Sequence, residues 1–292
     1  MYTQLLPIII PMLVCVAVGY GWARTSFPFE REFLTRMVMN VGAPCLVFDG
    51  LTTLSSSPTE FYRSAAIAGW LIGFCFVAGA LLLKLAKQPV RSYVPAVMFG
   101  NMGHLGVPLC AFAFGDEGLG LVIGFYIAAS VIQFVVGPML QGRQAAWRTL
   151  LTTPIVYSAL LGLLLLQTEA AIPLAVANTV SLIGGITLPL MLIAMGYSLA
   201  TFKVARLNTA IGITVLRFSL GMTAGLLAIW ALQLEGVIRG VVLIEACMPV
   251  AVFNFLFAAR YDRAPEDVAG AILVSTVLSF LTLPWLLLWA LV

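Results

Sequence analysis

Charged residues are scarce in this chain of 292 residues, since Asp, Glu, Lys and Arg together make up only 9% of it. Soluble domains carry about 25% charged residues. No soluble fold of this size could bury the 62% of residues that are hydrophobic. The composition excludes a soluble globular enzyme, a disordered protein and a nucleic-acid-binding protein. The net charge of +3 is too small to indicate a polyanionic partner.

Metal-binding and catalytic patterns are also missing from the sequence. It has no H-E-x-x-H motif, no paired acidic clusters for magnesium, no G-x-S-x-G serine and no Walker motif. We therefore expect no catalytic residue, no metal, no cofactor and no direct use of ATP. The cysteines lie singly in apolar runs with no CxxC pair, which predicts small packing residues; they are Cys15, Cys45, Cys75, Cys110 and Cys247.

Long apolar runs dominate the chain instead. A membrane-spanning helix needs about 20 largely apolar residues, and the runs lack the alternating pattern of barrel strands. The expected fold class is an all-α polytopic membrane protein with ten transmembrane helices and short loops. No basic residue precedes the first run, which favours a retained span over a signal peptide. The ten runs are Leu5–Trp22, Phe33–Leu54, Tyr62–Leu83, Tyr93–Phe114, Gly118–Leu140, Leu150–Gln167, Pro173–Leu199, Thr209–Leu232, Val237–Ala259 and Val268–Leu291.

Lys and Arg are distributed unevenly among the predicted loops. With the N-terminus outside, 12 of the 15 basic residues fall in cytoplasmic loops. Only Arg63 and Arg239 fall outside, and Arg217 lies within a span. Because cytoplasmic loops carry an excess of Lys and Arg, this pattern predicts an integral plasma (inner) membrane protein with both termini facing outside.

Prolines inside the spans recur in the two halves of the chain, at separations of 145, 141 and 146 residues. The pairs are Pro44 and Pro189, Pro108 and Pro249, and Pro138 and Pro284. They predict two five-helix repeats, residues 1–140 and 150–292. Because five is odd, the second repeat enters the membrane from the opposite side. The result is an inverted-topology repeat, a common architecture of secondary transporters.

Spans 4 and 9 carry residues that interrupt a helix. Span 4 combines Gly100, Gly103 and Gly106 with Pro108, and span 9 has Pro249 near its middle. In lipid, freed backbone groups are tolerated only where protein or a polar cavity satisfies them. We therefore predict broken helices that cross near the bilayer centre. Their half-helix N-termini would suit an anion.

Several stretches of the sequence resemble the auxin efflux carrier family, and the likeness covers nearly the whole chain. These stretches are Leu5–Ile9 with Gly19, Ala43–Pro44 with Leu46–Phe48, Gly100–Gly103 with Gly106–Pro108, Met248–Pro249, and Ser275–Ser279 with Leu283–Pro284. The short predicted loop Gln141–Thr149 is similar to that of bacterial members. The resemblance implies a 5+5 inverted repeat, related to the bile acid:sodium symporter and sodium/proton antiporter folds.

The same resemblance also implies how the parts of the protein work. Spans 1, 2, 6 and 7 would form the scaffold and a homodimer contact, while spans 3–5 and 8–10 would form a moving transport domain. Movement would be of the elevator type, and the substrate a small organic anion bound at the crossing of spans 4 and 9.

Candidate substrate- or ion-binding residues lie near the predicted breaks and on span 2. They are Asn101, Gly103, His104, Pro108, Glu245, Pro249, Asn254 and Asn40. His104 and Glu245 each precede a repeat-related proline by four residues, so we predict that they are approximate symmetry mates. Asn40 is expected to face the same cavity.

Four ionisable residues lie within the predicted spans, where charge is costly and usually functional. They are Asp49, His104, Arg217 and Glu245. His104 and Glu245 are candidates for proton or cation coupling. Alternatively, His104 forms a structural hydrogen bond at the helix break and Glu245 forms a structural ion pair. Arg217 is expected to pair with Glu245 or Asp49 rather than bind a substrate carboxylate.

The sequence leaves three function classes open. The first is a secondary transporter of small organic anions, coupled to protons or driven by membrane potential. The second is a sodium-coupled organic anion symporter, and the third is a channel, which the inverted repeat disfavours. Malate, malonate and indole-acetate-like acids all remain candidate substrates, and no nucleic-acid partner is expected. Sodium ligands would come from Asn101, Gln133, Glu245, Asn254, Thr276 and Ser279.

Overall fold

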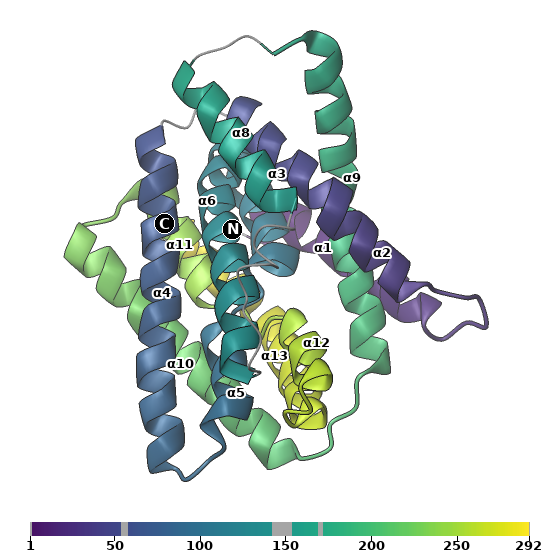
Figure 1. Cartoon of the computed structure of the whole chain (residues 1–292), viewed down its shortest axis with the longest axis vertical. Coiled ribbons are helices and arrows are strands. Elements are labelled where there is room, and N and C mark those ends of the chain that lie inside the picture. The colour runs from purple at the N-terminus through teal and green to yellow at the C-terminus, as the bar shows by residue number, and fades with distance from the viewer. Residues whose placement is uncertain (1, 54–57, 142–153, 169–171, 292) are drawn as a thin grey trace.

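The described residues fold almost entirely into helices (Figure 1). The structure is a computed structural model and describes residues 2–53, 58–141, 154–168 and 172–291. The first half contains α1 (Tyr2–Trp22), α2 (Arg31–Met37), the π-helical turn η1 (Val38–Gly42), α3 (Ala43–Thr53), α4 (Pro58–Leu85), α5 (Val90–Met98), the π-helical turn η2 (Met102–Gly106) and α6 (Val107–Gln141). The second half contains α8 (Pro154–Thr168), α9 (Leu174–Thr201), α10 (Leu207–Leu232), α11 (Gly236–Ala246), α12 (Phe253–Arg260) and α13 (Pro265–Ala290).

Within the described residues, five helices are long and apolar enough to cross a membrane. They are Thr59–Leu85, Met102–Gln141, Leu174–Thr201, Leu207–Leu232 and Pro265–Ala290. Shorter apolar helices cover Leu6–Trp22 and Pro154–Leu165. The prediction of a helical membrane protein is therefore confirmed, while the number of ten spans stays a prediction. The start of the sixth predicted span and most of the loop before it lie outside the described residues.

Helix α6 reverses its direction at Gly115. The backbone of Gly115 leaves the helical region (φ 62°, ψ −145°), a conformation that glycine adopts without steric cost. As a result, a Cβ atom on Gly103 would lie only 2.6 Å from the ring of Tyr126. In one straight helix these two residues would be about 35 Å apart. The reversal brings the second arm of α6 alongside η2.

The helices pack in two groups. In the first group, α1 packs against α9, and α3 packs against both α8 and α9. In the second group, α4 packs against α5, α6 and α10, and α10 packs against α11 and α13. In Figure 1, α9 runs along the right, α4 along the left, and α6 between them. Contacts of α6 with α1 and α3, and of η2 with α9, join the groups.

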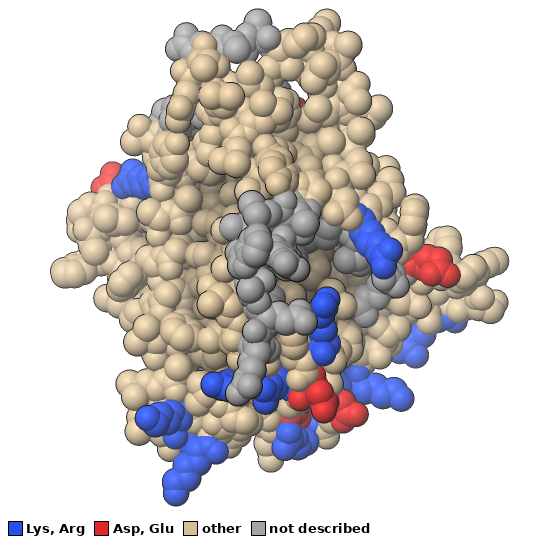
Figure 2. All heavy atoms as spheres, viewed as in Figure 1, with Lys and Arg blue, Asp and Glu red and all other residues tan. Residues whose placement is uncertain are grey.

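Charged side chains gather at one end of the molecule. On the face in Figure 2, most Lys and Arg side chains lie along the lower edge, near the ends of α5 and α10 in the same view (Figure 1). Above that edge extends a broad surface of uncharged residues. This surface is suited to contact with lipid.

Candidate functional site

Two extended segments from opposite halves of the chain meet in the interior. Helix α5 ends at Met98, α11 ends at Ala246, and Gly100 pairs with Val250 in an antiparallel bridge. The Asn101 amide donates to the Pro249 carbonyl at 2.7 Å. The Ala251 amide donates to the Phe99 carbonyl at 3.0 Å. We call residues 99–101 and 249–251 the crossing.

Local sequence explains why the chain becomes extended at the crossing. Pro249 has no amide hydrogen and disfavours helical continuation. Gly100 lacks a Cβ atom, and one added there would lie 2.7 Å from the Arg217 Nη2 atom. A glycine at this position therefore lets the Arg217 guanidinium approach the backbone.

Arg217 on α10 joins both interrupted helices at the crossing. Its side chain is 1% exposed. Its guanidinium donates to the carbonyls of Met248 at 3.0 Å, Ala246 at 3.1 Å, Val97 at 3.2 Å and Met98 at 3.5 Å. These carbonyls lie at the C-terminal ends of α5 and α11. There the last carbonyls of a helix have no amide donor within the helix, and the helix dipole places a partial negative charge. The Arg217 charge therefore compensates both helix ends.

The prediction that Arg217 pairs with Glu245 or Asp49 is wrong. Among the described residues, Arg217 forms no ion pair with either carboxylate. Its donors are taken by backbone carbonyls and by the Cys75 Sγ atom at 3.5 Å. Asp49 lies on α3 in the other helix group and contacts Ser181 of α9.

Glu245 is fully buried and faces the first arm of α6. Its Oε1 atom accepts a hydrogen bond from the Cys110 thiol at 3.8 Å. A Cβ atom on Gly106 would lie 2.1 Å from the same oxygen, so a glycine there makes room for the carboxyl. The Oε2 atom has no hydrogen-bond partner among the described residues. A buried oxygen without a hydrogen-bond partner is energetically costly, so Glu245 stays a candidate functional residue.

Two small cavities flank the crossing, each with a volume of about 20 Å³. His104 and Phe253 line both of them, with ring centroids 5.2 Å apart. Each cavity has room for about one water molecule. The first is lined by Gly100, Asn101, Met102, Gly103, Tyr126, Ala129, Ser130, Gln133 and Ala251 as well. The second reaches α9 through Ala194, Met195 and Ser198.

Amide side chains surround the crossing. Asn101 Nδ2 contacts the Met195 Sδ atom at 3.4 Å, which links the crossing to α9. Asn254 Nδ2 donates to the Phe99 carbonyl at 3.3 Å, and Gln133 Nε2 donates to Asn254 Oδ1 at 3.3 Å. The result is a polar region built from both halves of the chain.

Most of the predicted site residues meet at this polar region. Asn101, Gly103 and His104 line the first cavity, and Pro249 and Asn254 lie at or beside the crossing. Sequence reasoning missed most of the other lining residues, because helix reversal and long-range packing place them there. Those with polar, sulfur-containing or aromatic side chains include Tyr126, Ser130, Met195, Ser198 and Phe253.

Asn40 does not face the cavity, contrary to prediction. Its side chain is exposed and donates to the Arg36 carbonyl at 2.9 Å. In η1, Gly42 is the residue that packs against α9, where its Cβ would lie 2.4 Å from Thr187 Oγ1. The Asn40 side chain, two residues earlier, therefore points away from α9.

Pro108 does not form the interruption of the fourth predicted span. It lies in the first turn of α6, where proline is tolerated, and the interruption lies at residues 99–101. Since Gly100 pairs with Val250, Glu245 precedes the crossing and His104 follows it. If the two halves form the predicted inverted repeat, the register of this bridge matches the position of His104 with that of Asn254. The prediction that His104 and Glu245 are symmetry mates does not fit this register.

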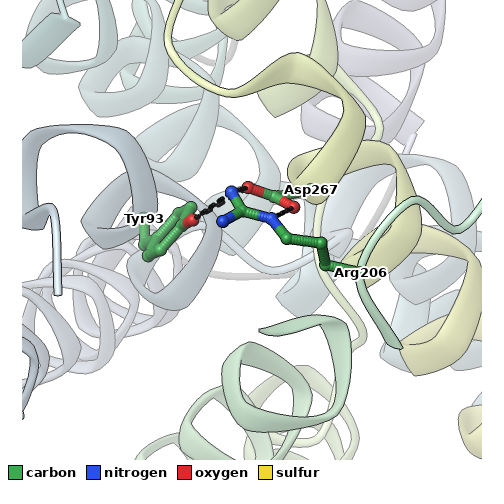
Figure 3. Close-up of polar contacts among 3 residues, drawn as sticks. All are labelled: Tyr93, Arg206 and Asp267. Carbon is green, nitrogen blue, oxygen red and sulfur yellow. Dashed lines mark hydrogen bonds and ion pairs between the residues drawn. The ribbon is translucent and has the colours of Figure 1, made fainter. Parts of the chain in front are cut away.

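A second polar cluster lies at the N-terminal ends of α10 and α13 (Figure 3). The Arg206 guanidinium binds both carboxylate oxygens of Asp267, with Nε to Oδ1 at 2.7 Å. The Tyr93 hydroxyl donates to Asp267 Oδ2 at 2.8 Å and accepts from Arg206 Nη2 at 3.1 Å. The cluster ties the connection between α9 and α10 to α5 and α13.

Comparisons with known proteins relate this chain to membrane transporters. The profile of a family described as "Membrane transport protein" matches residues 139–287. A protein of Methanothermobacter thermautotrophicus named as an uncharacterized transporter is 28% identical over 97% of both chains. A Rhizobium meliloti protein whose name marks it as a candidate malonate transporter is 23% identical over 96% of this chain and 94% of its own.

A plant protein is also similar to part of the chain. Auxin efflux carrier component 1 of Arabidopsis thaliana is 26% identical over 46% of this chain, which is 22% of the plant protein. The similarity to the auxin efflux carrier family seen in the sequence motifs is thus found again by an alignment over part of the chain.

Proposed function

Since this chain belongs to the membrane transport protein family, we propose that it is an auxin efflux carrier-like secondary active transporter of small organic anions. It moves carboxylates across the plasma membrane by elevator-type alternating access. The substrate binds where the two interrupted segments cross. The chain spans the membrane ten times as a 5+5 inverted repeat, with both termini outside.

Equivalent packing in the two halves supports the inverted repeat. The contact of α1 with α9 has its counterpart in the contact of α8 with α3. Likewise, α4 packs against α5 and α6 as α10 packs against α11 and α13. The first group of helices corresponds to the scaffold, where two copies would meet as a homodimer. The second group corresponds to the transport domain.

The observation that carries the anion assignment is the position of Arg217. Its guanidinium compensates the negative C-terminal ends of α5 and α11 and has no carboxylate partner among the described residues. The helical turns that begin after the crossing, at Met102 and Phe253, present their positive N-terminal ends to the cavities. A cavity bounded by positive helix ends and amide donors suits a carboxylate.

The same observation weakens the sodium-coupled alternative. Unwound carbonyls and half-helix C-terminal ends are the groups that coordinate sodium in transporters of this architecture, and Arg217 occupies four of them. In favour of sodium, the buried Thr276 Oγ1 atom has no hydrogen-bond partner among the described residues. We keep the sodium-coupled symporter as the second candidate.

The two small cavities support a moving transport domain. A dicarboxylate is larger than the roughly single water that each cavity holds. The second cavity lies between α9 of the scaffold group and η2 and α12 of the other group. Substrate entry would therefore require the two groups to shift apart at α9. Glu245 would take up a proton during the cycle through its open oxygen.

Transport assays in liposomes test the proposal. Purified protein would be reconstituted, and exchange of labelled malonate, malate and indole-acetate measured under imposed proton, sodium and potential gradients. We expect saturable carboxylate exchange that responds to pH or membrane potential. Sodium-dependent exchange would favour the symporter, and the absence of exchange of any carboxylate would contradict the proposed function.

A matched pair of asparagine variants locates the site in the same assay. Asn101→Ala removes an amide that lines the first cavity, and we expect exchange to fall more than tenfold. Asn208→Ala removes an exposed amide at the start of α10, and exchange should stay at the wild-type rate. Equal rates in the two variants would place the substrate elsewhere.

A further inference from the structure

A groove of about 530 Å³ lies between α4 and α10, away from the crossing. Its volume falls within the range of about 300–1,000 Å³ found for small-molecule sites. The two helices are antiparallel, so that the N-terminal part of α4 meets the C-terminal end of α10. The groove is lined by Arg63, Ala66, Trp70, Leu227, Trp230 and Ala231, among others.

The walls of the groove are apolar and face outward. Trp70 and Trp230 are 46% and 73% exposed, and small alanines line the same groove. The Trp70 ring is fixed because its Nε1 atom donates to the Ala224 carbonyl of α10 at 3.1 Å. In a membrane protein, exposed apolar surface contacts acyl chains, and tryptophans lie at the level of the headgroups. The groove has the form of a channel for one acyl chain.

Arg63 adds a charge at one end of this apolar groove. It is exposed and forms no ion pair with another described residue. The Arg63 side chain can lay its methylene stem along the groove and extend its guanidinium to the headgroup level. Guanidinium groups bind phosphate oxygens bidentately.

The opposite end of the α4–α10 pair provides an internal comparison. A second groove of about 350 Å³ lies there, lined by Gln88, Tyr93, Asn208 and Thr209 together with apolar residues. No Lys or Arg is among its lining residues. The groove at Arg63 is distinguished by apolar walls, two tryptophans and an arginine without an ion-pair partner among the described residues.

We propose that the groove between α4 and α10 is a binding site for an anionic phospholipid. One acyl chain lies between Trp70 and Trp230, and the phosphate is held by Arg63. The lipid bridges two helices of the second group and stabilises their packing. This site is independent of the proposed transport function.

Lipid binding by the purified protein tests this proposal. Native mass spectrometry and thermal unfolding would compare phosphatidylglycerol, phosphatidylcholine with the same acyl chains, and glycerol phosphate without a chain. We expect phosphatidylglycerol to bind most tightly and to raise the Tm most. Arg63→Gln should weaken phosphatidylglycerol binding about fivefold, the effect of one basic residue at an anionic lipid surface.

Two further variants keep the test decisive. Arg239→Gln removes the other arginine predicted outside, which lies beyond the groove and donates to the Trp289 carbonyl, and it should bind lipid as wild type does. Ala66→Phe fills the groove from an exposed position and should abolish binding although Arg63 remains. Unchanged lipid affinity in Arg63→Gln or in Ala66→Phe would overturn the site. Equal binding of glycerol phosphate alone would indicate a free-phosphate site and overturn the lipid assignment.

Discussion

Two arginines on or beside α10 serve different purposes. Arg206 lies just before the helix, has a 63% exposed side chain and pairs with Asp267. Arg217, 11 residues later and about 16 Å further along the helix, is 1% exposed and binds carbonyls of two interrupted helices. Arg206 thus fixes the N-terminal end of α10 to α13 at the surface. Arg217 instead compensates the dipoles of two helix ends in the interior. Burial determines how much each contributes to stability.

Replacing Arg217 is expected to have the largest effect. Arg217→Gln leaves up to four buried carbonyls short of a donor, at about 1–3 kcal/mol for each unsatisfied group. We expect a destabilisation of about 3 kcal/mol or more, measured by thermal unfolding and by the monodisperse fraction in detergent. Arg217→Lys keeps the charge but reaches fewer carbonyls, so its loss should be intermediate. A wild-type Tm in Arg217→Gln would contradict the role assigned to this arginine.

A methyl group at Gly100 tests the contact between the Arg217 guanidinium and the backbone of the crossing. In Gly100→Ala the new Cβ would lie 2.7 Å from Arg217 Nη2, and Arg217 cannot move without losing carbonyl contacts. We expect a destabilisation of about 1–3 kcal/mol, typical of overpacking. Gly73→Ala is the matched control, because a Cβ there meets nothing within 4 Å. Equal Tm values for the two variants would show that the crossing tolerates the methyl group.

The sequence predicted the parts of the crossing that depend on the local backbone, but not those that depend on contacts between distant residues. Apolar runs located the helices, and Gly100 and Pro249 marked the two segments that meet, because proline and glycine act through the local backbone. The partner of Arg217 could not be predicted, since every residue carries a carbonyl and only the fold selects four of them. The predicted position of Asn40 was wrong because Gly42, two residues later, packs against α9, while the Asn40 side chain is exposed.

Replacing Glu245 is expected to reduce transport strongly while changing the stability of the fold only slightly. Glu245 is buried but unpaired with Arg217, so the isosteric Glu245→Gln should cost less than about 1.5 kcal/mol. Transport should nevertheless fall at least tenfold and lose its response to pH, because glutamine cannot take up a proton. Had Glu245 paired with Arg217, removing its charge would cost about 3–5 kcal/mol. Thermal unfolding therefore distinguishes the two arrangements, and liposome exchange measured on the same preparation tests the proton role.

Replacing the exposed Arg206 is expected to have the smallest effect on stability. In Arg206→Gln, the buried Asp267 carboxylate keeps its hydrogen bond from the Tyr93 hydroxyl at 2.8 Å and its favourable position in the first turn of α13. The loss in Tm should be several-fold smaller than in Arg217→Gln and should shrink at high salt, because exposed charges are screened.

Asp267→Asn supplies the contrast for Arg206→Gln, because it removes the charge that both Tyr93 and Arg206 contact. It should destabilise the protein more than Arg206→Gln does. The part of the loss that comes from the buried contact with Tyr93 should persist at high salt. If Arg206→Gln instead destabilised the protein as much as Arg217→Gln, exposure would not separate the two arginines. The connection between α9 and α10 would then be a principal contributor to the stability of the fold.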